Sequence, residues 1–121
     1  MLNRLLIIGI LLATACTSST VIDGFSSEKW GNDQNGCNGD RSVLVELIVE
    51  QKDKLIGSSQ TQITKILGKP DRHELYSRNK KAFAYFVKNG PACRNEIEKA
   101  NKLVLRFDAL GRVNEIILYK N

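Results

Sequence analysis

The N-terminal segment limits how much of this chain is left to fold. Arg4 is followed by a largely apolar run over 5–12 and then by the small residues Ala13 and Ala15. This pattern is typical of a cleaved secretory signal, and the run is far shorter than the roughly 20 residues of a membrane-spanning helix. Removal of residues 1–15 from the 121-residue chain leaves 106 residues, enough for one small domain.

The residue directly after Ala15 is a cysteine. This placement resembles the signal of bacterial lipoproteins, which implies cleavage before Cys16 and attachment of lipid to Cys16. In that class an aspartate in the next position marks retention at the inner membrane. Thr17 stands there instead, so the resemblance implies an anchor in the outer membrane, with the domain facing the periplasm. A secreted protein without lipid stays an alternative, because Ala13 stands where leucine is commoner. We expect a signal peptide over 1–15, a flexible Ser- and Thr-rich tether over 16–29 and a folded domain over 30–121.

The three cysteines predict one disulfide. If Cys16 carries lipid, an even pair is left in an oxidising compartment, which favours a Cys37–Cys93 bond. Such a bond closes a loop of about 57 residues and stabilises the domain by about 4 kcal/mol through chain entropy. A metal site is disfavoured, because the cysteines lack CxxC spacing and His73 is the one histidine of the chain.

Two helices are expected before any strand. The first covers 41–54, with Asp40 as its N-cap, and apolar residues recur along one side of it at helical spacing. That stripe comprises Leu44, Leu47, Ile48 and Leu55.

The second helix covers 60–67. Ser59 and Gln62 have the spacing of a capping box, in which each side chain satisfies a backbone N–H of the other residue. Gly68 is expected to end this helix in the left-handed conformation, and Pro70 prevents its continuation.

Beyond Pro70 the apolar period changes to two, which indicates strands. We expect strands over 73–76, 82–87, 102–107 and 113–119, with Gly111 in a tight turn before the last. The predicted fold class is α+β, with two N-terminal helices packed on one face of an antiparallel three- to four-stranded meander sheet. The other face would hold Val104, Arg106, Ile117 and Tyr119, unless the register slips by one residue. We expect contacts with a partner at Tyr76, Tyr85, Arg106 and Tyr119.

Two motifs resemble one family. Gly57-Ser58-Ser59 with Ile63 and Leu67-Gly68-Lys69-Pro70, followed by the hairpin over 103–113, resembles the SmpA/OmlA (BamE-like) outer-membrane lipoprotein domain. The resemblance spans about 65 residues. It implies the α+β fold, the envelope compartment and a role near the machinery that assembles outer-membrane barrels. The cysteine pair and the segment over 30–41 are not marks of that family.

Composition and side-chain chemistry disfavour catalysis and nucleic-acid binding. The mature chain carries a net charge of about +4 without a clustered basic motif, so we expect no nucleic-acid partner. His73 lies near Asp71 and Glu74, but solvated polar residues at a strand edge explain this group better than a metal or acid–base site. No nucleophile elbow or glycine-rich phosphate loop occurs. We expect no enzymatic activity, no metal and no cofactor.

Two functions remain open at this point. The first is a lipid-anchored module that binds an envelope protein or lipid headgroups, in outer-membrane protein assembly or envelope integrity. The alternative is an inhibitor of an envelope or periplasmic hydrolase. In that case the disulfide would fix the polar segments over 31–40 and 90–101 as a rigid inhibitory loop.

Overall fold

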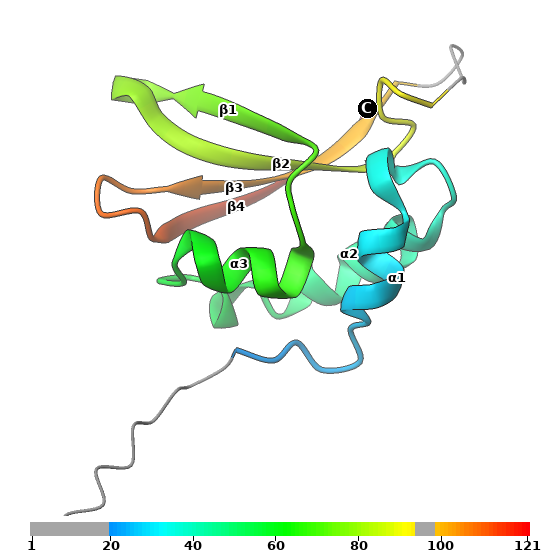
Figure 1. Ribbon diagram of the computed structural model, residues 1–121, viewed down its shortest axis with the longest axis horizontal. Coiled ribbons are helices and arrows are strands. Elements are labelled where there is room, and N and C mark those ends of the chain that lie inside the picture. The colour runs from blue at the N-terminus through cyan, green and yellow to red at the C-terminus, as the bar shows by residue number, and fades with distance from the viewer. Residues whose placement is uncertain (1–19, 94–98) are drawn as a thin grey trace, which may run out of the picture.

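The computed structural model describes residues 20–93 and 99–121, and in these ranges it is a two-layer α+β fold (Figure 1). Three helices lie on one face of a four-stranded antiparallel sheet with strand order β1-β2-β3-β4. The helices are α1 Ser27–Asn32, α2 Asp40–Glu50 and α3 Gln60–Leu67. The strands are β1 Arg72–Tyr76, β2 Lys80–Lys88, β3 Asn101–Phe107 and β4 Val113–Tyr119. Short 3-10 turns cover Gln34–Gly36, Lys52–Lys54 and Ser77–Asn79. The predicted α+β class and the antiparallel meander are confirmed, but the helices number three in the described residues rather than the expected two, because α1 was not predicted.

The start of α2 differs from the sequence prediction. Gly39, with a φ of +89°, is the N-cap, and Asp40 is the first helical residue. The carboxylate of Asp33 accepts the backbone N–H groups of Asn38 (2.7 Å) and Arg41 (2.9 Å). The Asp33 carboxylate, from the preceding turn, therefore satisfies a free backbone N–H at the start of α2, which is the role that was expected of Asp40.

Local signals predict the start of α3 correctly but not the backbone conformation at its end. The Ser59 hydroxyl accepts the N–H of Gln62, and the Gln62 side chain accepts the N–H of Ser59, so the capping box is confirmed. Gly68 has the expected positive φ of +73°, but its ψ of −171° is extended rather than left-handed helical. The chain therefore leaves the helix in an extended path toward β1.

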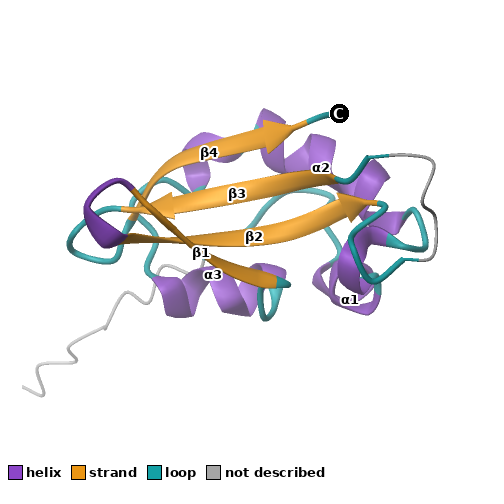
Figure 2. Ribbon diagram, turned by 90° about the horizontal axis from the view of Figure 1, so that it is seen from above, coloured by secondary structure: helices purple, strands orange, loops and turns teal. Residues whose placement is uncertain are grey.

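The register of the strands divides the sheet into a covered and an open face (Figure 2). Ala82 pairs with Arg106 and Ala84 with Val104 across β2 and β3, and Val104 in turn pairs with Ile117 of β4. Because side chains alternate along a strand, these residues share the face that is turned away from the helices. The expected grouping of Val104, Arg106, Ile117 and Tyr119 is confirmed.

The core lies between the helices and the covered face, and it begins earlier in the chain than residue 30. Ile22 is buried in this core, Phe25 packs against it, and α1 starts at Ser27 to place Trp30 inside it. The expected tether is therefore too long, because residues 22–29 belong to the folded domain. The predicted signal over 1–15 and the rest of the tether up to residue 19 lie outside the described residues.

Candidate functional site

The open face of the sheet carries a shallow depression of about 430 Å³. Three of the four residues expected to contact a partner line it, namely Tyr76 of β1, Arg106 of β3 and Tyr119 of β4. Ala82 and Val104, which are both buried, also line it. Small residues at the middle of the face thus leave a hollow between larger aromatic and charged side chains.

Arg106 connects the two tyrosines of this depression. One guanidinium nitrogen pairs with Glu115 at 3.1 Å, and the other donates to the hydroxyl oxygen of Tyr119 at 3.3 Å. The guanidinium carbon lies 5.1 Å from the centre of the Tyr76 ring, a cation–π distance. The Tyr76 hydroxyl donates to the carbonyl of Phe107. These contacts hold two aromatic rings and one cation in fixed positions.

A second cation, the Lys102 ammonium, also lines the depression. The Lys102 ammonium pairs with Glu74 at 2.9 Å and lies 5.6 Å from the centre of the Tyr119 ring. The side chains of Lys102 and Glu74 are only 29% and 25% exposed, so this pair is screened less than a fully exposed one. The arrangement offers hydrogen-bond donors and aromatic rings for recognition.

Tyr85 is not a surface residue, and the expected partner contact there is wrong. It pairs with Leu103 on the covered face, is fully buried and donates its hydroxyl to the carbonyl of Gly68 at 2.8 Å. Burial raises the pKa of the Tyr85 hydroxyl well above its usual range, the nearby Arg41 opposes this rise, and Asp71 adds to it.

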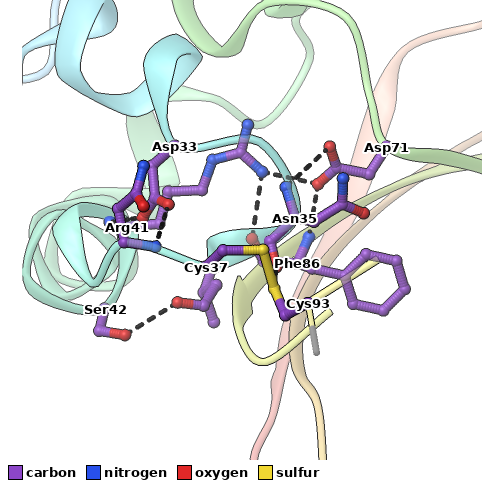
Figure 3. Close-up of a disulfide and its surroundings, with 10 residues drawn as sticks. Asp33, Asn35, Cys37, Arg41, Ser42, Asp71, Phe86 and Cys93 are labelled. Carbon is purple, nitrogen blue, oxygen red and sulfur yellow. Dashed lines mark hydrogen bonds and ion pairs between the residues drawn. A yellow bond between two sulfur atoms is a disulfide. The ribbon is translucent and has the colours of Figure 1, made fainter. Parts of the chain in front are cut away.

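The predicted disulfide is present and joins two loops beside the sheet (Figure 3). Cys37 and Cys93 have Cα atoms 5.5 Å apart. The same loops are connected through their backbones, because Gly90 N–H donates to the carbonyl of Asn35 at 2.8 Å and Asn89 N–H to that of Gly36 at 3.3 Å. We call the residues 33–39 and 89–93 the stapled loops.

A buried ion pair that was not predicted from the sequence lies beside the disulfide. Arg41 is 1% exposed and its Nη1 contacts the Asp71 carboxylate at 2.6 Å (Figure 3). The Arg41 side chain also donates to the carbonyls of Trp30 (2.8 Å) and Phe86 (3.1 Å). Asp71 accepts the N–H groups of Phe86 (2.8 Å) and Asn35 (3.3 Å), so the pair joins α1, α2, β2 and the stapled loops. The burial of Arg41 could have been inferred from its spacing, because Arg41 lies four and seven residues before Val45 and Ile48, the other buried residues of α2.

His73, Asp71 and Glu74 do not form one site, because each has a different partner. His73 is exposed and packs edge-on against Phe83, with ring centres 5.2 Å apart, whereas Asp71 pairs with Arg41 and Glu74 with Lys102. The expectation that Asp71 is a solvated edge residue is wrong. Within 20–93 and 99–121 no group of three or more potential metal ligands is found. None of the helices in these ranges is long and apolar enough to cross a membrane.

The predicted lipidation site, Cys16, lies outside the described residues. Comparison of the chain with protein-family models, curated proteins and solved structures found no match. The likeness to the SmpA/OmlA domain therefore stays a prediction that rests on the two motifs.

Proposed function

We propose that this protein is a lipid-anchored, periplasm-facing envelope module that binds a protein partner through the open face of its sheet. The observation that carries the proposal is the ordered depression formed by Tyr76, Arg106 and Tyr119. Tyrosine and arginine are enriched where binding energy concentrates in protein interfaces. Side chains already held in place lose little conformational freedom on binding, which favours affinity.

The charges of this face favour an acidic partner segment. Cations outnumber carboxylates at the register positions that share the face, where Arg72, Lys80, Lys102 and Arg106 stand against Glu74 and Glu115. Complementary charge raises association rates and disfavours wrong partners more than it adds affinity. We therefore expect binding to weaken as the salt concentration rises.

The proposed anchor and compartment rest on the sequence alone, through the resemblance of residues 1–16 to a lipoprotein signal. Lipid on Cys16 would confine the module to the membrane surface and raise its effective concentration near membrane partners. The more specific part of the proposal, a role beside the barrel-assembly machinery, rests on the motif resemblance alone.

Affinity capture from solubilised envelopes tests the proposal. The bait is the oxidised, lipidated protein, compared with Arg106→Glu and with Cys16→Ser. Lys52→Glu is the matched control, because it makes the same charge reversal at an exposed residue outside the sheet. We expect discrete partners that Arg106→Glu loses and Lys52→Glu keeps. Equal recovery of the same partners with Arg106→Glu and with Lys52→Glu would contradict the proposal.

The inhibitor alternative is favoured by one observation, the double connection of the stapled loops through a disulfide and two backbone hydrogen bonds. Gln34 and Asn38 are exposed on these loops and can be replaced without disturbing them. Gly36 cannot, because a Cβ there would lie 2.5 Å from the carbonyl carbon of Val87. If the protein inhibits a purified envelope hydrolase such as a β-lactamase, and Gln34→Ala with Asn38→Ala abolishes that inhibition, the alternative replaces the proposal.

A further inference from the structure

The early start of the folded domain brings it close to its predicted anchor. Only five residues lie between Cys16 and Ile22, which is 4% exposed and packed in the core. Because an extended chain spans at most about 3.5 Å per residue, the core lies within about 20 Å of the lipid attachment point. A lipidated domain of this kind has a bilayer within reach of its own surface.

One end of the sheet exposes apolar side chains in neighbouring loops. Leu110, in the β3–β4 turn, is 83% exposed, and Ile56, in the loop before α3, is 45% exposed. The two loops are joined, since Gly57 N–H donates to the carbonyl of Val113 at 2.8 Å and Val113 N–H donates to that of Ser58 at 2.9 Å. We call this region, together with the β1–β2 turn, the turn end (Figures 1 and 2).

Cations lie beside these apolar side chains. A depression of about 720 Å³ separates the two sheet turns, with Arg78, Lys80 and Lys81 on one side and Leu110 on the other. Asp108 also lines the depression, but its carboxylate accepts the N–H groups of Leu110 (2.9 Å) and of Arg112 (3.1 Å) within its own turn. An exposed apolar tip next to cations is the pattern by which proteins bind the surface of anionic membranes.

The β1–β2 turn holds an arginine in an unfavourable conformation. Arg78 and Asn79 have φ values of +60° and +59°, a region that suits glycine or asparagine at the centre of a tight hairpin. Arginine has no intrinsic preference for this conformation. Strain of this kind tends to collect at functional positions, which supports a role for Arg78 at the turn end.

We propose that the turn end docks on the anionic surface of the bilayer that carries the lipid anchor. This inference rests on the proposed function for the anchor at Cys16. The N-terminal segment is joined to the stretch of chain that leads to Ile56, because Asp23 N–H donates to Gln51 Oε1 at 2.8 Å and the Asp23 carboxylate pairs with Lys54, two residues before Ile56. The open face points away from the helices and stays available to a protein partner (Figure 1).

Fluorescence quenching on vesicles tests this orientation. The full, lipidated and oxidised chain is bound to vesicles of brominated phosphatidylcholine, with and without phosphatidylserine. Leu110→Trp places a reporter at the turn end, and Val43→Trp is the matched control, because Val43 is 75% exposed on α2. The native Trp30 is fully buried and gives the same background in both variants. We expect quenching of Leu110→Trp, strengthened by phosphatidylserine, and no added quenching of Val43→Trp.

Charge reversals show whether cations drive the docking. In the Leu110→Trp chain, Arg78→Glu with Lys81→Glu should lower the docking constant on phosphatidylserine vesicles by about fivefold for each cation removed. Lys29→Glu with Lys69→Glu is the control pair and should leave it unchanged. If the protein sediments with vesicles while Leu110→Trp stays unquenched, or if both reporters are quenched equally, docking by the turn end is refuted. Sedimentation with vesicles tests the lipid anchor, and affinity capture from envelopes tests the open face as a partner surface. A failure of docking by the turn end can therefore be distinguished from a failure of the proposed function.

Discussion

Replacement of Arg41 by methionine tests the buried ion pair beside the staple. Methionine keeps an unbranched side chain out to the ε position but removes the guanidinium charge and all three donated hydrogen bonds. Asp71, whose side chain is 6% exposed, would then hold a negative charge with only backbone donors around it. An uncompensated buried charge costs about 3–5 kcal/mol, because it has lost its hydration without gaining a partner.

The pair can be separated from the rest of the core by a double-mutant cycle. In Arg41→Met with Asp71→Asn neither charge is left, so the loss should be smaller than the sum of the two single losses. We expect a coupling free energy of about 2 kcal/mol, within the range of residues that share one hydrogen-bond network.

Urea unfolding of the oxidised protein, followed by far-ultraviolet circular dichroism, measures these free energies. With a slope of about 2 kcal/mol per molar urea, Arg41→Met should lower the midpoint by about 1.5–2.5 M. A loss below about 1 kcal/mol, or additive effects in the cycle, would refute the reasoning that the charge of Arg41 is required by its buried partner.

Three further predictions concern stability. Cys37→Ser with Cys93→Ser should lower the free energy of unfolding by about 4 kcal/mol, measured by urea titration against the oxidised protein. Above about pH 10, where tyrosines ionise in the unfolded chain, burial of Tyr85 holds its proton in the folded state. Stability should therefore fall with rising pH by up to about 1.4 kcal/mol per unit more steeply in the native protein than in Tyr85→Phe, and equal slopes would contradict this. Gly90→Ala should lower the melting temperature, because its Cβ would lie 2.4 Å from a backbone oxygen. Gly31→Ala, with open space around the Cβ, should not.

The elements that the sequence predicted correctly depend on contacts close in the chain. The capping box of α3 lies within four residues, and the β3–β4 hairpin is set by the turn that ends at Gly111, with a φ of +75°. The disulfide was predicted because the third cysteine was assigned to lipid, which left one pairing.

The errors arose where the chain gives no periodic signal. Residues 82–87 are buried on both faces of β2, so apolar alternation could not assign Tyr85 to the covered side. Ile22 lies in a short segment without a repeating apolar pattern, so its place in the core could not be predicted. The Arg41–Asp71 pair joins residues 30 positions apart, and no spacing rule connects them.

The most direct test of the central claim, that the open face is the partner surface, is photo-crosslinking in intact cells. A photoreactive amino acid replaces Tyr119, which is 38% exposed at the rim of the depression, and in a second strain it replaces Val43, which is 75% exposed on α2. We predict a discrete protein adduct at position 119 that is lost when Arg106→Glu is added, and no such adduct at position 43. Adducts at position 43 alone, or the same adduct at both positions, would contradict the account.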